Sequence, residues 1–441
     1  MKRLLSLLLC VVLALFCATT AQAAGVSITL TASEYALHYA FDAGAQDPFV
    51  ILEYATPAEK GWMMLYSADG RFEGDIALAY SGAGGKTSVA LTSARTTGSI
   101  GKASTTLPKA ADYQKPTGKS NAKVTDFVLT ETPEGFHYAF NAAGTDYMLL
   151  YWRSKEQTVT QPVYPDENGH YEGDVVSELT FARTQFTVQV KSGSGSMKKE
   201  ATVRKGYQAP EAPQRQEGRL SGVTVCIDAG HQENGRFVNE PIGPGLSGST
   251  SGKGGMAQGT KTNRRESIVC LEIGMLLRDE LLRQGANVIM TREDQTTFHT
   301  NIERCEIAEA GGAQIMLRLH CNNSSNRSKR GIQVYGPLNS DYAKAVADAD
   351  TYREMGQKLL DAMKTRVGMT LANSTGMVRL NDNYVGNNWA KMMCFLVEMG
   401  YLSNPAEEYL LVTPVYQQWL AEGMADGVYE IAVARGWVQA Q

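Results

Sequence analysis

The fold of the second half of this 441-residue chain is decided by one stretch, Val223-Thr224-Val225-Cys226-Ile227-Asp228-Ala229-Gly230-His231. Its first five residues are apolar or β-branched, which is typical of a strand buried on both faces of a sheet. Similar short apolar runs recur at 287–291, 314–319 and 392–397. Between these runs, apolar residues at helical spacing predict helices at 266–283 and 343–367. Strands that alternate with helices predict an α/β domain with a mostly parallel sheet flanked by helices.

Polar or ionisable residues follow three of the predicted strands. His231 follows the first strand, His320 and Asn322 follow the third, and Glu398 follows the last. Ligands bind at the carboxyl ends of the strands in an open parallel sheet, so these side chains are expected to meet at one edge. A further acid, Glu266, opens the helix after the first strand. Two imidazoles and a carboxylate are a common ligand set for catalytic zinc, and a second, unligated glutamate would then be the base.

In their order along the chain, these motifs resemble the zinc-dependent N-acetylmuramoyl-L-alanine amidases of the amidase-3 family. The resemblance covers nearly all of residues 222–437. It rests on Asp228-Ala229-Gly230-His231, Arg265-Glu266, Thr291-Arg292-Glu293-Asp294, Glu303-Arg304, Leu319-His320-Cys321-Asn322 and the segment 396–404. The chain departs from the family at Gln232, where a second glycine is common, and in a Gly/Ser-rich insertion from Gly243 to Gly259. A long loop beside a site is usually functional, and we expect this one to shape the substrate groove.

The resemblance implies a metal site and a reaction. One Zn²⁺ per catalytic domain would be held by His231, Glu266 and His320, and Glu398 would act as general base and then general acid. The bond cut would be the amide between N-acetylmuramic acid and L-alanine in peptidoglycan. The residues by themselves indicate only metal-assisted amide hydrolysis. Arg304 and Asn322 either position substrate or brace loops, and the sequence leaves both interpretations open.

The first half contains an internal repeat. His38-Tyr39-Ala40-Phe41-Asp42 reappears as His137-Tyr138-Ala139-Phe140-Asn141, and Arg71-Phe72-Glu73-Gly74-Asp75 reappears as His170-Tyr171-Glu172-Gly173-Asp174. Polar and apolar residues alternate at 87–92 and 185–190, which predicts half-buried strands. We therefore expect two small all-β sandwiches, similar in architecture to immunoglobulin-like or fibronectin-type modules. The sequence leaves open whether the repeats bind cell wall, a partner protein or nothing.

Within these repeats the histidines and aromatic residues are expected to be structural. His38 and His137 occupy equivalent positions among strand residues, where a structural role is favoured over metal binding. The aromatic residues Trp152, Tyr138 and Tyr171 are expected to pack in a core rather than to form a sugar-stacking face.

The N-terminus has the pattern of an export signal. Lys2 and Arg3 precede an apolar run at 4–18, and Ala21-Gln22-Ala23 is typical of a cleavage site. No later stretch is long and apolar enough to span a bilayer, so no transmembrane segment is expected after cleavage. A secreted or cell-envelope protein of a bacterium is predicted. The net charge of −4 argues against a nucleic-acid binder.

The predicted domains follow from these patterns. They are a signal peptide (1–23), a first β-sandwich repeat (24–108), a linker (109–122), a second repeat (123–207), a second linker (208–219) and the catalytic domain (220–441). The cysteines of the mature chain have mostly apolar neighbours and are expected to be small buried residues: Cys226, Cys270, Cys305, Cys321 and Cys394.

Two other functions stay open at this point. One is a non-catalytic wall-binding or scaffold protein, in which the repeats carry the function and the amidase-like domain is degenerate. The other is a zinc peptidase of similar fold that cuts between amino acids.

Overall fold

The computed structural model describes residues 19–440 apart from 22–24, 79, 97, 112, 114–122, 133–134, 146, 155–156, 177–184, 193–194, 205–209, 233–237, 251–254, 263 and 368–376. Most of the predicted signal peptide and of the linker 109–122 therefore lies outside the described residues. Within the predicted signal, Thr19–Ala21 form strand β1 beside β2. The chain divides into two compact units, residues 1–205 and 206–441.

The first unit is all β, and both repeats follow one plan. In the first repeat, one sheet holds β1, β2 (Ile28–Ala32), β3 (Ala36–Asp42) and β6 (Arg71–Ala77). The other strands of the first repeat are β4 (Phe49–Ala55), β5 (Glu59–Tyr66), β7 (Gly85–Ser93) and β8 (Ser99–Leu107). In the second repeat, one sheet holds β9 (Thr125–Thr132), β10 (Gly135–Asn141) and β13 (His170–Val176). The other strands of the second repeat are β11 (Met148–Arg153), β12 (Gln157–Val163), β14 (Gln185–Lys191) and β15 (Met197–Arg204).

Each repeat has an apolar core of its own. The prediction that the aromatic residues pack inside is confirmed, because Trp152 and Tyr171 are fully buried and Tyr138 is 7% exposed. Phe136 and Phe186 contact the Trp152 ring with centroids 6.1 and 5.9 Å away. Such contacts between aromatic rings stabilise a core beyond the area that they bury.

The two repeats share one sheet, which the sequence does not predict. Strand β12 pairs antiparallel with β5, so that strands of both repeats form a continuous sheet in the order β15-β14-β11-β12-β5-β4-β7-β8. Across this junction, the Tyr80 ring meets Trp152 edge-on at 5.9 Å. Pairing two edge strands removes exposed backbone donors and acceptors and makes the repeats one compact unit.

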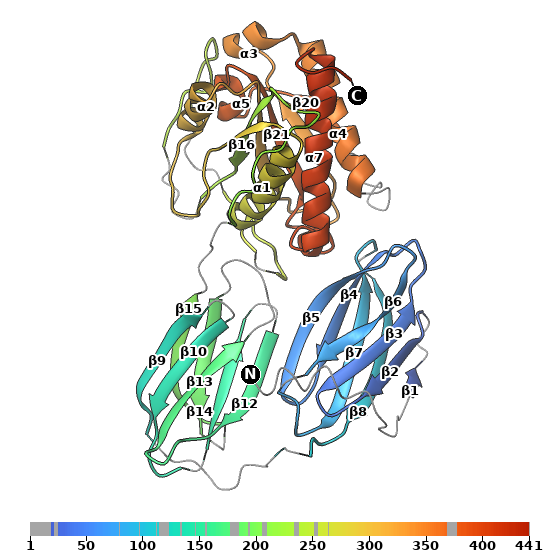
Figure 1. Cartoon of the computed structure of the whole chain (residues 1–441), viewed down its shortest axis with the longest axis vertical. Helices are drawn as coiled ribbons and strands as arrows, with labels where there is room; N and C mark the ends of the chain where they lie inside the picture. The colour runs from blue at the N-terminus through green and yellow to red at the C-terminus, as the bar shows by residue number, and fades with distance from the viewer. Residues whose placement is uncertain are drawn as a thin grey trace. The chain divides into compact units, whose positions relative to one another are not determined.

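The second unit is an α/β domain on a six-stranded sheet (Figure 1). In sheet order its strands are β17 (Asn287–Met290), β16 (Thr224–Ala229), β18 (Ile315–Asn322), β21 (Met393–Tyr401), β19 (Gln333–Gly336) and β20 (Met377–Leu380). Strand β16 runs parallel to β17 and β18, and β18 runs parallel to β21. Strand β19 runs antiparallel to β21 and parallel to β20. The carboxyl ends of β16, β18 and β21 therefore lie at the same edge.

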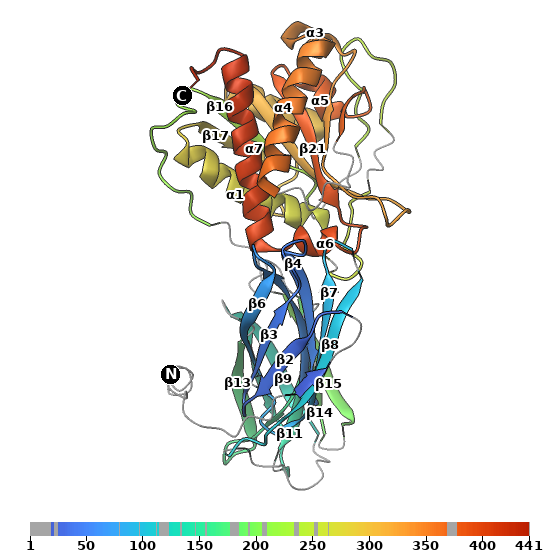
Figure 2. The ribbon, with the colours of Figure 1, turned by 90° about the vertical axis from the view of Figure 1, so that its right-hand side faces the viewer.

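Helices flank this sheet (Figure 2). They are α1 (Glu266–Arg283), α2 (Asn301–Ala310), α3 (Asp341–Val346), α4 (Ala349–Val367), α5 (Val385–Trp389), α6 (Glu407–Leu410) and α7 (Pro414–Ala434). Helices α1 and α4 pack against α7, and α2 packs against α5. Cys305 of α2 packs with Cys226 of β16, whereas Gly274 of α1 lies next to Ile227, so α1 and α2 cover opposite faces of the sheet.

Helix α1 has the predicted bounds, but the predicted helix 343–367 is wrong as a single element. The chain forms α3 and α4 with a break at Ala347, whose backbone is extended. Asp348 then accepts the backbone N–H of Thr351 at 2.7 Å and caps the first turn of α4. An aspartate within an apolar helical pattern was therefore the sign of a new helix start.

The segment 208–219, predicted as a linker, lies with the second unit wherever it is described. Arg278 of α1 donates to the Pro210 carbonyl oxygen at 2.9 Å, and the Gln216 N–H donates to the Leu282 carbonyl oxygen at 3.0 Å. The five cysteines are buried, as predicted, and carry free thiols. Among the helices of the described chain, none is long and apolar enough to cross a membrane.

Candidate metal centre

Three predicted ligands meet at the carboxyl edge of the sheet. His231 follows β16, Glu266 is the first residue of α1, and His320 lies in β18. Nε2 of His231 and Nδ1 of His320 each lie 3.0 Å from Oε1 of Glu266. The three candidate ligand atoms lie within 4.8 Å of one another. Two imidazoles therefore converge on one carboxylate oxygen.

The backbone before His231 is shaped for this approach. His231 has φ 57°, a left-handed conformation that is uncommon for a residue with a side chain. A Cβ atom at Gly230 would lie 2.7 Å from Nε2 of His320 and 2.4 Å from the Leu319 carbonyl oxygen. Gly230 is therefore required where it stands, because a side chain there would push the two imidazole-bearing segments apart.

Backbone N–H groups orient the Glu266 carboxylate. Cys321 donates to Oε1 at 3.0 Å, and Ala257, from the end of the insertion before α1, donates to Oε2 at 2.7 Å. Burial alone would raise the pKa of Glu266, but its hydrogen bonds with His231 and His320 lower it below the usual range. A carboxylate held ionised between two imidazoles is suited to bind a cation.

The donor set fits a zinc ion. Nε2 of His320 and Oε2 of Glu398 are buried, and neither has a hydrogen-bond partner among the residues described. Burial lowers the pKa of His320, against the opposing effect of Glu266, and so favours the neutral imidazole that coordinates metals. Two histidine nitrogens and one carboxylate oxygen form a ligand set that zinc commonly adopts, with a further position for water.

Glu398 lies next to this trio on the neighbouring strand. It is the register partner of His320 in the parallel pairing of β18 with β21, so both side chains leave the same face of the sheet. Burial and the negative charge of Glu266 raise the pKa of Glu398 to about 8. A glutamate with a raised pKa beside a possible metal site has the properties of a proton-transfer group.

Arg304 and Asn322 lie in different surroundings. Arg304 is 3% exposed, and its guanidinium donates to Asp228 and to the carbonyl oxygens of Ala229 and His231, at 2.5, 3.0 and 3.2 Å. These contacts favour the interpretation that it braces a loop. Asn322 is partly exposed and donates to Oε1 of Gln333 at 3.1 Å. Its two interpretations both remain compatible with this position.

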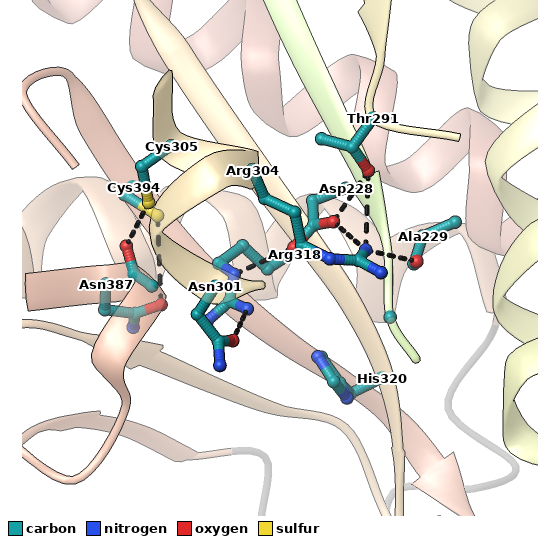
Figure 3. Close-up of polar contacts among 12 residues, drawn as sticks. Asp228, Ala229, Thr291, Asn301, Arg304, Cys305, Arg318, His320, Asn387 and Cys394 are labelled. Atoms are coloured by element: carbon teal, nitrogen blue, oxygen red, sulfur yellow. Dashed lines mark hydrogen bonds and ion pairs between the residues drawn. The ribbon is translucent and has the colours of Figure 1, made fainter. Parts of the chain in front are cut away.

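An ionic cluster behind the ligands is not predicted from the sequence. Figure 3 shows Arg304 and Arg318 on the fully buried Asp228, which also accepts from the Thr291 hydroxyl at 2.7 Å. Burial alone would raise the pKa of Asp228, but the two guanidinium groups hold it well below its usual range. The signal was present, since an aspartate directly after an apolar strand needs a buried partner.

The segment between His231 and Glu266, which contains the insertion, is attached to the rest of the domain on both sides of the insertion. Glu240 accepts the side-chain amide of Asn301 and the backbone N–H of Ile302 at the start of α2. At its other end, Glu408 is fully buried and accepts the backbone N–H of Lys261 at 2.8 Å. Buried carboxylates thus hold the chain on either side of the insertion.

The second half of the chain is similar in sequence to known proteins. The sequence model of the N-acetylmuramoyl-L-alanine amidase family matches residues 225–430. A germination-specific N-acetylmuramoyl-L-alanine amidase of Bacillus subtilis is 26% identical over 231 residues, which are 49% of this chain and 83% of the relative. A probable cell wall amidase of Staphylococcus aureus, LytH, is 27% identical over 218 residues, which are 48% of this chain and 60% of the relative.

A solved structure also aligns with this half of the chain. The crystal structure of an N-acetylmuramoyl-L-alanine amidase from Clostridium difficile 630 is 25% identical, with a TM-score of 0.37, over 48% of this chain and 96% of that one. The family match and the two sequence relatives identify the domain. Residues 225–430 of this chain are a domain of the N-acetylmuramoyl-L-alanine amidase family.

Proposed function

We propose that this protein is a secreted, zinc-dependent peptidoglycan hydrolase that cuts the amide bond between N-acetylmuramic acid and L-alanine. The observation that carries the proposal is the convergence of His231 and His320 on Glu266, with Glu398 on the adjacent strand. The family supplies the substrate class. The side chains present are the basis for proposing zinc as the metal and Glu398 as the base.

His231, Glu266 and His320 would hold one Zn²⁺ ion, which supplies Lewis-acid polarisation of the scissile carbonyl and a water of lowered pKa. The protein's part is to place the proton acceptor. Glu398 takes the proton of the attacking water and delivers it to the nitrogen of the leaving L-alanine as the C–N bond breaks. The parallel register of Glu398 with His320, whose side chains leave the same face of the sheet, supports this role. Its raised pKa suits a group that must give the proton back.

A non-catalytic scaffold is the less favoured alternative, because three candidate metal ligands converge and Glu398 is the register partner of one of them. If the second unit is catalytic, the β unit would assist it, either by binding cell wall or by binding a partner protein. Cosedimentation of the Glu398→Gln variant of the full chain with peptidoglycan measures wall binding without turnover.

Product analysis tests the function. The full chain, with the signal removed near Ala24, is incubated with peptidoglycan, and the soluble products are analysed by mass spectrometry. The expected products are peptides with a free L-alanine N-terminus and glycan with a free lactyl carboxylate. A zinc peptidase would instead release fragments cut between amino acids. Activity that survives complete removal of metal would contradict the proposed mechanism.

The proposed export is tested at the N-terminus. Expressed in a bacterium, the chain is expected outside the cytoplasm with its mature N-terminus near Ala24. A protein recovered from the cell envelope or medium that still begins at Met1 would contradict cleavage of the signal.

A further inference from the structure

One buried arginine connects the backbone segments that carry two of the candidate ligands. Arg292 follows β17 and is 2% exposed. Its guanidinium donates to four carbonyl oxygens, those of Ala229, Gly230, Ser267 and Asp294, at 2.7 to 2.9 Å. Two of these oxygens belong to the segment that leads into His231, and the Ser267 oxygen belongs to the residue after Glu266.

Hydrogen bonds of Arg292 to Ala229 and Gly230 hold the loop before His231. The carbonyl oxygens of Ala229, Gly230 and His231 each accept from a guanidinium, either that of Arg292 or that of Arg304. Three consecutive carbonyl groups cannot be satisfied by a strand once the chain turns into the left-handed conformation of His231. The two arginines replace the missing sheet partners and fix that turn.

A hydrogen bond of Arg292 to Ser267 holds the start of α1. Nη2 of Arg292 bonds the Gly230 and Ser267 carbonyl oxygens, each at 2.8 Å. Nε2 of Gln295 donates to the same Ser267 oxygen at 3.0 Å. A single nitrogen of Arg292 therefore bridges the segment that carries His231 and the helical turn that carries Glu266.

The charge of Arg292 is placed differently from that of its neighbours. Arg304 and Arg318 both contact the carboxylate of Asp228, whereas the hydrogen bonds of Arg292 in the described chain go to carbonyl oxygens. Burial, together with the charge of Arg304, lowers the pKa of Arg292 to about 10, so it remains charged at neutral pH. A planar guanidinium donates to several acceptors in fixed directions, which a lysine ammonium cannot reproduce.

We propose that Arg292 is a positioning residue of the metal centre, which sets the spacing between the His231 and Glu266 ligands by bonding the backbone of both segments. The proposal rests on the proposed zinc binding. Residues that hold metal ligands in place from behind typically change metal affinity by about 10- to 100-fold when they are replaced.

Zinc affinity, measured by competition with a chelator, tests this role. Arg292→Lys keeps the charge but loses the planar guanidinium that donates to several acceptors at once. Zinc affinity is therefore expected to fall by about 10- to 100-fold. The control is Arg278→Lys, because Arg278 is also buried at 4% exposure and also donates to a backbone oxygen, that of Pro210, away from the ligands. The control is expected to lose thermal stability but to keep the parent's zinc affinity. The visible spectrum of the cobalt-substituted proteins is expected to change only in the Arg292 variant.

Each outcome is decisive. Equal zinc affinities and equal cobalt spectra in Arg292→Lys and the parent would overturn the positioning role while leaving the proposed function intact. A parent that binds no zinc would overturn the proposed function itself. If Arg292→Lys does not fold, Gln295→Ala decides, because it removes the other side-chain donor to the Ser267 oxygen. Zinc affinity in Gln295→Ala is then expected to be several-fold weaker, and an unchanged affinity would contradict the proposal.

Discussion

The histidines of the two units differ in a way that separates a surface pair from a candidate metal centre. In the β unit, His38 and His137 occupy equivalent positions, and Nδ1 of each lies about 3 Å from an aspartate on the next strand, at 3.0 and 2.9 Å. The Nε2 atom of each ring faces a glutamate instead, at 3.5 and 3.2 Å. Each imidazole thus lies between two acids.

In the amidase domain the relation is reversed, since two imidazoles share one acid. His231 and His320 both approach Oε1 of Glu266, whose side chain is only 4% exposed. The glutamates beside His38 and His137 are 75% and 59% exposed. A histidine near a carboxylate is therefore no evidence for a metal site. Convergence of several donors on one buried point is the informative feature.

The largest expected effect comes from removing one imidazole on each side of this comparison. His320→Ala is expected to lower zinc affinity by more than about 100-fold, beyond the usual effect of a residue behind the ligands, and to abolish turnover. His137→Ala removes an imidazole that is also bonded to a carboxylate and is expected to change neither. Zinc content after dialysis and peptide release measure both. Equal zinc loss in the two variants would contradict the assignment of the ligands.

Glu398→Gln separates the base from the ligands. The amide keeps the size of the side chain but cannot accept the water's proton, so turnover is expected to fall by about 100- to 10,000-fold while zinc stays bound. Glu293→Gln is the matched control, because the Glu293 side chain is 57% exposed. If the Glu398 variant turned over at the parent rate, the base would have to be another group.

The buried and exposed acids of the two units predict different costs for stability. Asp228→Asn removes the carboxylate that pairs with two buried guanidinium groups, and is expected to destabilise the second unit by about 3 to 5 kcal/mol. Asp42→Asn breaks a pair with Arg71 whose side chains are 61% and 77% exposed, and no measurable change is expected. Chemical denaturation followed by fluorescence compares the two, and similar losses would contradict the comparison.

A smaller effect is expected in the pH dependence of unfolding. Burial raises the pKa of Glu407 to about 7, although it accepts the backbone N–H groups of Tyr401 and Gly331. The folded protein then binds a proton that the unfolded chain releases near pH 4.5, so this group's stabilisation is present at low pH and is lost as pH rises through about 7. Glu407→Gln is expected to flatten that part of the curve. An unchanged slope of melting temperature against pH would mean that a group other than Glu407 binds this proton.

The candidate ligands can be picked out from the sequence, whereas the contacts that hold their backbone segments cannot. Helix α1 begins at Glu266 as expected, because that residue opens a clear helical pattern. The predicted strands at 314–319 and 392–397 are too short, since β18 and β21 continue through His320 and Glu398. A change from apolar to polar residues looked like the end of each strand, whereas both strands continue through the candidate ligand His320 and the proposed base Glu398.

Other features leave little trace in a single sequence. The hydrogen bonds of Arg292 go to backbone oxygens, which every residue has, so no pairing pattern reveals them. The junction of β5 with β12 involves two edge strands, and neither its periodicity nor its turns differ from those of an exposed edge. The assignment of the repeats to immunoglobulin-like or fibronectin-type modules stays a prediction.

In the proposed metal centre, two imidazoles and one carboxylate hold a single ion while a second carboxylate faces it. Anomalous diffraction at the zinc edge, from crystals of the zinc-loaded protein, measures this directly. One strong peak is expected at about 2.0 to 2.2 Å from His231, Glu266 and His320, with Glu398 near the ion but not bonded to it. A zinc peak held by other residues, or one that lacks any of these three ligands, would contradict it.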